Sequence, residues 1–166
     1  PVGSAGTQML PESQLDRFMI KLSMGYPDPA SEIAILKDRQ GANPLNDVKQ
    51  VVDGKDIVMM QAETDNLHMD DAIIEYITML SFATRQNPLI ELGVSPRGSI
   101  ALAGMSKAKA YISGRTYVTP EDVQSIFKDV AGHRIILNPR AKISSVTIDE
   151  VIDNIFRTVP VPRAMR

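Results

Sequence analysis

The chain has 166 residues, of which 43% are hydrophobic and 23% are charged, a composition typical of one globular domain rather than of a disordered segment. The absence of Cys excludes disulfides and thiolate metal sites and favours a cytoplasmic protein, and no apolar run is long enough to predict a membrane span. The net charge of −2 is unevenly divided, because residues 1–85 carry 7 Lys and Arg against 13 Asp and Glu, whereas residues 86–166 carry 11 against 7.

A short helix and a short strand are the first elements that the sequence predicts. A Pro-Glu pair suited to a helix start stands near the beginning of Leu10–Phe18, and Arg17 is expected to point away from the apolar face of this helix. In the apolar run Phe18–Met24, polar residues stand at alternate positions, which predicts a strand. Residues Gly25–Asp28 (GYPD) are a predicted turn and hinge.

After this hinge the predicted elements are helices, with one short strand or extended edge at His133–Leu137. Capping residues, several followed directly by Pro, predict helix starts at Asp28, Asn46, Asp70 or Asp71, Ser95, Thr119 and Thr147, and a further helix follows Gly54. Apolar residues at helical spacing predict the buried faces, among them Ile33, Ile35 and Leu36 in the first helix, Val48, Val51 and Val52 in the second, and Ile73, Tyr76, Ile77, Leu80 and Ala83 in the longest. The predicted fold class is therefore mainly α.

The stretch Gly93–Ile100 (GVSPRGSI) carries the first candidate site. Ser95 is a predicted N-cap and Pro96 a first helical residue, so Arg97 falls in the first turn of the helix. The unpaired N–H groups and the macrodipole of that turn disfavour a cation unless both serve one anion, and phosphate is the natural candidate. The alternative is an arginine on a solvated surface, which the sequence leaves open.

Few other residues suggest chemistry. A Gly-Lys pair at residues 54–55 is followed by Asp instead of Ser or Thr, so it does not form a phosphate-binding loop. His68 and His133 lie far apart, and no cluster has the spacing of metal ligands, so we expect no metal site and no independent active site. Arg17 and Arg97 remain. Neither can act as an acid or a base, but both could stabilise charge on a transferred phosphoryl group.

Taken in order, six segments resemble MoxR-type AAA+ ATPases: GTQMLPESQLDRF, MGYP, YITMLSFATR, GVSPRGSIAL, KAKAYISGRTYVTPEDV and GHRIIL. The resemblance covers nearly the whole chain and is to the C-terminal part of such a protein. It implies a helical-bundle AAA+ lid domain at residues 28–166, preceded at residues 1–27 by a short helix-strand remnant of the α/β ATPase core. The Walker A, Walker B and sensor 1 segments of the family would lie upstream of Pro1, and the chain by itself is expected to be inactive.

The same resemblance assigns roles to the two arginines. Arg17, in LDRF, matches the arginine finger that reaches the γ-phosphate bound by a neighbouring subunit, and is the expected catalytic residue. Arg97, in SPR, matches the sensor 2 arginine, which contacts the nucleotide of its own subunit. The sequence departs from the family at residues 1–6 (PVGSAG), a stretch that often carries acidic residues, and at Gly98, where Ala is usual. The glycine is expected to weaken the first helical turn by roughly 1 kcal/mol.

For the whole protein, the resemblance implies ATP hydrolysis with Mg²⁺ as the cofactor, in a ring of identical subunits that is expected to be a hexamer. It also implies chaperone-like remodelling or maturation of client proteins, in some cases with partners that carry a von Willebrand factor A domain. Binding to a membrane or to nucleic acid is not expected.

An alternative of a different class is a separate helical interaction module without enzyme activity, which binds nucleic acid through its basic half. The helices that start at Pro96 and Pro120 could imitate a helix-turn-helix. Against this alternative, the connection Gly114–Thr119 is longer than the usual turn of about 3–4 residues, and the second helix carries more carboxylates than lysines. A steep salt dependence of binding to duplex DNA would favour the module.

Overall fold

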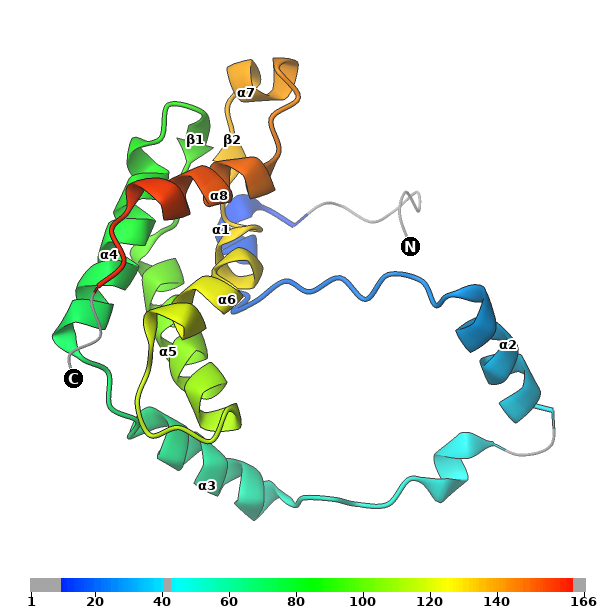
Figure 1. Ribbon diagram of the computed structural model, residues 1–166. Helices are drawn as coiled ribbons and strands as arrows, with labels where there is room; N and C mark the ends of the chain where they lie inside the picture. The colour runs from blue at the N-terminus through cyan, green and yellow to red at the C-terminus, as the bar shows by residue number, and fades with distance from the viewer. Residues whose placement is uncertain (1–9, 41–42, 163–166) are drawn as a thin grey trace. The chain divides into compact units, whose positions relative to one another are not determined.

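The computed structural model describes residues 10–40 and 43–162 and is mainly helical, which confirms the predicted fold class (Figure 1). Its elements, in chain order, are α1 (Glu12–Leu15), α2 (Pro29–Asp38), the 3₁₀ helix η1 (Pro44–Asp47), α3 (Gly54–Asp65), α4 (Asp71–Gln86), β1 (Ile90–Leu92), α5 (Pro96–Ile112), α6 (Pro120–Ala131), β2 (Ile136–Leu137), α7 (Pro139–Ile143) and α8 (Ile148–Thr158). None of the helices described has the length and apolar character needed to cross a membrane. The chain divides into two compact units, Leu22–Glu63 and the pair Pro1–Lys21 with Thr64–Arg166, and each is treated by itself below.

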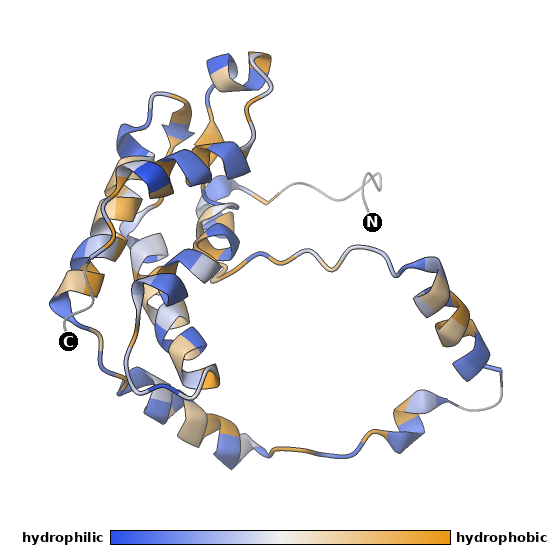
Figure 2. Cartoon of the chain, viewed as in Figure 1, coloured by the Kyte–Doolittle hydropathy of each residue, from blue (hydrophilic) through white to orange (hydrophobic). Residues whose placement is uncertain are grey.

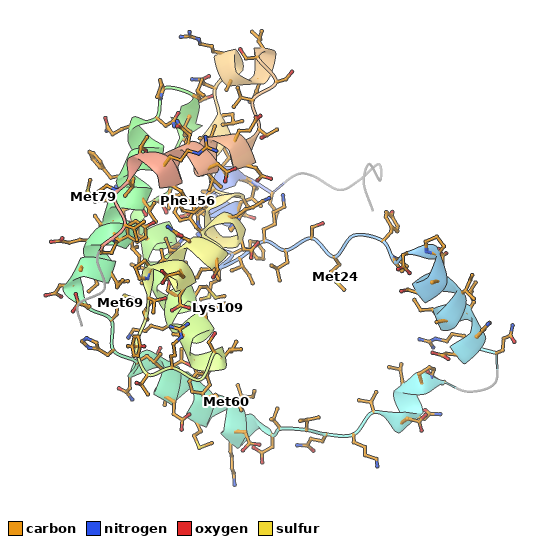
Figure 3. The ribbon with its side chains drawn as sticks, viewed as in Figure 1. Met24, Met60, Met69, Met79, Lys109 and Phe156 are labelled. Carbon is orange, nitrogen blue, oxygen red and sulfur yellow. The ribbon has the colours of Figure 1, made fainter. Side chains whose placement is uncertain are left out.

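The larger unit is a bundle in which α4, α5, α6 and α8 surround one apolar core. The stripe predicted for α4 is confirmed, with exposed fractions of 5% or less at Ile73, Tyr76, Ile77 and Leu80 and partial burial at Ala83. Orange and blue residues accordingly alternate along this helix in Figure 2. The ring of Phe156, labelled in Figure 3, packs edge to face on Phe127 with the two centroids 5.3 Å apart.

Side-chain caps explain where the bundle helices begin. The carboxylate of Asp70 accepts the N–H of Ala72 at 2.8 Å, which starts α4 as predicted. The same kind of cap starts α5 after Ser95 and α8 after Thr147, and both starts were predicted. α6 follows Thr119, whose N–H and hydroxyl both donate to the carboxylate of residue 122.

The two short strands pair antiparallel, with Ile90 opposite Leu137. The extended edge predicted over residues 133–137 is thus confirmed as a strand at its last two residues. Its partner β1 was not predicted, because three residues are too few to show a periodic pattern. Helix α7 was not predicted either, although the side chain of Asn138 accepts the N–H of Ala141 at 2.9 Å and a proline follows the cap, as in the longer helices.

The strand predicted at Phe18–Met24 is wrong, since no strand lies between α1 and α2. The N–H of Lys21 instead donates to the carbonyl of Asp129 in α6, at 2.9 Å. A strand needs a neighbouring strand to satisfy its backbone groups, and in the sheet of the described structure β1 and β2 pair only with each other.

The unit Leu22–Glu63 contains α2, η1 and all of α3 except its last two residues. Its first helix begins as predicted, because the carboxylate of Asp28 accepts the N–H of Ser31 at 2.7 Å, and the third begins at Gly54 as predicted. The helix predicted to start from Asn46 is wrong. The cap of a short 3₁₀ helix lies three residues earlier, at an asparagine followed by proline, and residues 48–53 after it form neither helix nor strand.

None of the helices in this unit contains a buried residue. The residues that were predicted to face inward are exposed, at 53% for Ile33, 52% for Ile35 and 63% for Leu36, and Val48, Val51 and Val52 are exposed as well. A unit of this size offers too little chain to enclose a core of its own. Met24, labelled in Figure 3, is almost fully exposed at 98%.

Candidate functional site

Arg17 lies on the turn that extends α1. The N–H groups of Arg17 and Phe18 donate to the carbonyls of Gln14 and Leu15, both at 3.1 Å, so helix-like bonding continues beyond the end of the helix. The Arg17 side chain is exposed, and its guanidinium makes no hydrogen bond or ion pair with any residue that the structure describes. It is therefore available to a group outside this part of the chain.

Arg97 is the second residue of α5 and is also exposed. The hydroxyl of Ser95 accepts the N–H of Gly98 at 3.2 Å, which caps the helix as the sequence predicted. The first turn contains no acidic residue that could neutralise the arginine, and within the described residues the Arg97 guanidinium has no partner. The helix N-terminus and this guanidinium can therefore serve one external anion.

The segments that carry these two arginines are joined by Asp16. The hydroxyl of Ser95 donates to the carboxylate of Asp16, at 2.9 Å from both oxygens. Asp16 directly precedes Arg17 in the chain, and Ser95 stands two residues before Arg97. The structure thus brings the two segments together through Asp16 and Ser95 and not through the arginines themselves.

A buried arginine, Arg134, completes this connection. Its Nε donates to Oδ1 of Asp16 at 3.0 Å, and its Nη2 donates to the carbonyls of Asp16 at 3.0 Å and of Phe18 at 2.6 Å. Its Nη1 donates to the carbonyl of Met19 at 3.2 Å and to that of Val130. All five N–H groups of the guanidinium therefore have an oxygen acceptor, and the side chain is only 1% exposed.

His133 lies against the same segment. Its Nε2 is 3.0 Å from the carbonyl of Phe18 and 3.0 Å from Nη1 of Arg134. Because the arginine already has five oxygen acceptors, we assign the proton to Nε2, which then donates to the carbonyl. Burial lowers the pKa of His133, the Phe18 carbonyl opposes that shift, and the Arg134 charge adds to it. The imidazole is therefore neutral at pH 7.

The loop before α5 is fixed from the side of α4. The N–H of Val94 donates to the hydroxyl of Thr84 at 2.9 Å, and the carbonyl of Val94 accepts from Nε of Arg85 at 2.7 Å. At the neighbouring Gly93, a Cβ would lie 2.8 Å from the Thr84 hydroxyl. These contacts hold the residues before the N-cap in place, and with them the start of α5.

Gly98 has a specific steric role that the sequence did not indicate. It is buried, and a Cβ at this position would lie 2.6 Å from Cγ1 of Val94 and 2.9 Å from Cδ of Arg134. A glycine is therefore required where the side chain of Arg134 passes the first turn of α5. The expected loss of helix propensity remains, but the turn is supported by the Ser95 cap and by Arg134.

Sequence reasoning singled out Arg17 and Arg97 but missed Asp16, Ser95 as its partner, and Arg134. The motif segments LDRF, GVSPRGSIAL and GHRIIL each contain one of these residues, so the signal was present. What the sequence could not supply was their contact in space. In the described part of the chain, no three His, Cys, Asp or Glu side chains are placed to hold a metal ion.

A family model described as the AAA lid domain matches residues 82–155. Over 162 residues the chain is 40% identical to an uncharacterised protein of Bacillus subtilis named YeaC, covering 98% of this chain and 51% of that protein. Over 172 residues it is 31% identical to Chaperone MoxR1 of Mycobacterium tuberculosis, covering 98% of this chain and 45% of that protein.

Among solved structures, the chain is similar to the crystal structure of a proposed ATPase from Cytophaga hutchinsonii. The TM-score is 0.88 at 32% sequence identity, and the match covers 98% of this chain and 52% of that chain. The chain therefore spans about half the length of the relatives that it matches. The matched lid region contains Arg97 and Arg134, whereas Asp16 and Arg17 lie before it.

Proposed function

Because this chain belongs to the MoxR-type AAA+ family, of which it represents the C-terminal part with the lid domain, we propose that the whole protein hydrolyses ATP. In this proposal Arg17 is the arginine finger, and Arg97 is the sensor 2 arginine. The ATPase core would precede the lid, with residues 1–27 as its last portion and residues 28–166 as the lid. This chain alone would be inactive, because the family's phosphate-binding loop would lie upstream.

The observation that carries the proposal is the pair of exposed guanidinium groups on two segments that Asp16 joins. An arginine without a carboxylate partner can bind two phosphate oxygens at once, in a bidentate geometry. Arg97 adds the unpaired N–H groups of a helix start, which favour an anion at the same place. Neither residue can transfer a proton, so their role would be to stabilise negative charge that develops on the transferred phosphoryl group.

ATP would be the substrate and Mg²⁺ the metal cofactor. Bound Mg²⁺ would neutralise charge on the β- and γ-phosphates. The described residues offer no cluster of ligands for it, so we propose that residues upstream of this chain and the phosphates themselves hold the ion. The contribution of this chain would be limited to the two arginines and to the framework that orients them.

The assembly and the clients are further parts of the proposal. An arginine finger acts on the nucleotide of a neighbour, so we propose a ring of identical subunits, with six as the expected number. One relative is named a chaperone, which supports chaperone-like remodelling or maturation of client proteins. We propose proteins with a von Willebrand factor A domain as partners. We place the protein in the cytoplasm because its sequence contains no Cys.

The test is to measure ATP turnover and ATP binding of the full-length protein. Arg17→Ala should abolish turnover and leave ATP binding intact, whereas Arg97→Ala should impair both. Arg140→Ala is the matched control, because Arg140 is an exposed arginine on α7 with no proposed role. Full turnover in Arg17→Ala would show that the finger assignment is wrong.

Mixing the two variants tests whether the arginines act on different nucleotides. In a mixed ring, an interface is intact when the Arg97→Ala subunit supplies the finger and the Arg17→Ala subunit holds the nucleotide. Roughly a quarter of the interfaces in an equal mixture have this arrangement, so part of the activity should return. If mixing restores nothing although the subunits co-assemble, the two arginines serve the same subunit and the proposal of a finger acting across the interface is wrong.

A further inference from the structure

Asp16 and Arg134 have no proposed contact with phosphate, but they connect the two segments that carry Arg17 and Arg97. Asp16 directly precedes Arg17, and its carboxylate accepts the hydroxyl of Ser95, which caps the helix that carries Arg97. We propose that Arg134 is a positioning residue, which holds these two segments in one geometry and thereby couples the nucleotide sites of neighbouring subunits. The inference rests on the proposed roles of Arg17 and Arg97.

Most acceptors of Arg134 lie in residues 16–19, which include the proposed finger Arg17 and are called the finger segment below. Four of its five N–H groups donate to residues 16–19, namely to the carboxylate and carbonyl of Asp16 and to the carbonyls of Phe18 and Met19. The fifth donates to the carbonyl of Val130 in the helix that precedes it. A lysine has three donors on one nitrogen and cannot reach acceptors on so many sides. The position therefore requires an arginine.

Arg134 also touches the first turn of α5 directly. Its Cδ lies 2.9 Å from the place that a Cβ of residue 98 would occupy. Because glycine has no side chain, it leaves enough space for the arginine at this position. The arginine thus contacts the finger segment through hydrogen bonds and the sensor 2 helix through packing. Its charge faces the Asp16 carboxylate, which in turn accepts from the cap of that helix. The two segments are therefore parts of one network with Arg134 at its centre.

This arrangement has a consequence in a ring. Arg17 would contact the nucleotide of the neighbour, and Arg97 would contact the nucleotide of its own subunit. A displacement of residues 16–19 would remove the Asp16 partner of Ser95 and shift Arg134 against the first turn of α5. Nucleotide contact at one site would therefore alter the affinity of the next site, which is the definition of coupling between sites.

The experiment compares Arg134→Lys with Arg115→Lys in the full-length protein. Arg115 also binds a buried carboxylate, that of Asp122, but lies at the opposite end of α6, so its replacement controls for the loss of a similar pair. Arg134→Lys should lower kcat about tenfold, because the finger would be misplaced. It should also bring the Hill coefficient of ATP hydrolysis from above one to one. Arg115→Lys should change none of these values beyond about twofold, which corresponds to less than about 0.5 kcal/mol in barrier height.

Asp16→Asn is the second variant, because it retains the size of the side chain and loses the charge that faces Arg134. It should reduce kcat and the Hill coefficient in the same direction, and thermal unfolding identifies variants that have lost their fold. If both variants are folded and keep wild-type kcat and Hill coefficient, or if the wild-type Hill coefficient is one, the coupling is refuted. The proposed function itself fails separately, when Arg17→Ala and Arg97→Ala keep full turnover.

Discussion

Gly98 and Arg134 are in such close contact that a Cβ at position 98 would lie 2.9 Å from Cδ of Arg134. An alanine is normally a better helix former than a glycine by about 1 kcal/mol. Here the methyl group would have to displace Val94 or the guanidinium stem of Arg134. The local preference of the helix and the packing of the site therefore favour different residues.

We predict that Gly98→Ala destabilises the chain by about 1–3 kcal/mol, as overpacked sites do. Gly104→Ala in the same helix is the control, because no atom lies within 4 Å of the added Cβ. That variant should gain up to about 1 kcal/mol. Urea denaturation of both variants measures the difference, and equal stabilisation by both would mean that Arg134 does not fill the space beside Gly98.

Thr84 provides a second prediction. Its buried hydroxyl accepts the N–H of Val94 and donates to the carbonyl of Ser81 at 2.6 Å, so Thr84→Val leaves a buried N–H without a partner. We expect a loss of about 1–3 kcal/mol. Thr78→Val on the same helix removes a hydroxyl from an exposed side chain and should cost less than about 0.5 kcal/mol. Similar losses for the two variants would contradict the role given to Thr84.

The carboxylate of Asp122 should make the stability of the fold depend on pH under acidic conditions. Burial disfavours its carboxylate, but the hydrogen bonds from Arg115 and Thr119 outweigh burial and hold the pKa of Asp122 below its usual 3.8. Because the folded-state pKa is lowered, this contribution to stability is complete above the unfolded-state value and is lost as the pH falls through 3.8 toward the folded-state pKa.

Replacing Asp122 should remove this pH dependence. Asp122→Asn should lower the free energy of unfolding by roughly 2–3 kcal/mol at pH 7, since Arg115 loses its partner. It should also flatten the dependence of stability on pH below 3.8. Denaturation of wild type and variant between neutral and acid pH gives both quantities, and an unchanged acid slope in the variant would assign the effect to other carboxylates.

The ion pair between Lys128 and Asp149 should contribute little. The nitrogen and oxygen are 2.5 Å apart, but both side chains are more than half exposed, at 63% and 56%. Exposed pairs are weakened by water and salt. We expect Lys128→Gln to leave the melting temperature unchanged at both low and high salt. A clear decrease at low salt alone would mean that this pair matters more than its exposure suggests.

The parts of the fold that were predicted correctly depend on short-range chemistry. The starts of α4, α5, α6 and α8 follow from a capping side chain that binds an N–H within three residues. The same logic applied to Asn138 would have found α7. Where the prediction depended on distant partners it was less successful, because the strand at Phe18–Met24 has no neighbour and the apolar residues of α2 have no core to join.

The residues of the candidate site also differ in whether the sequence could identify them. Arg97 was identified from its place in a helix start, which is a local property. Arg134 could not be identified as a partner of Asp16, because 118 residues separate them and no pattern along the chain records the contact. Gly98 could be seen as unfavourable for the helix, but the reason for it lies in that distant arginine. Long-range contacts thus supplied what the sequence alone could not.

The separation between Asp16 and Arg134 also bears on the order in which the chain folds. Contacts such as those between α5 and α6 close short loops, whereas the bonds from Arg134 to residues 16–19 close a very long one at a higher cost in entropy. We therefore expect the helical bundle to form first and the finger segment to dock last. The last part to dock is commonly the first to open in the native state. Amide hydrogen exchange should then be faster at residues 12–21 than in α5 and α6, and the residue proposed to act on a neighbour would belong to the part of the unit that detaches most readily.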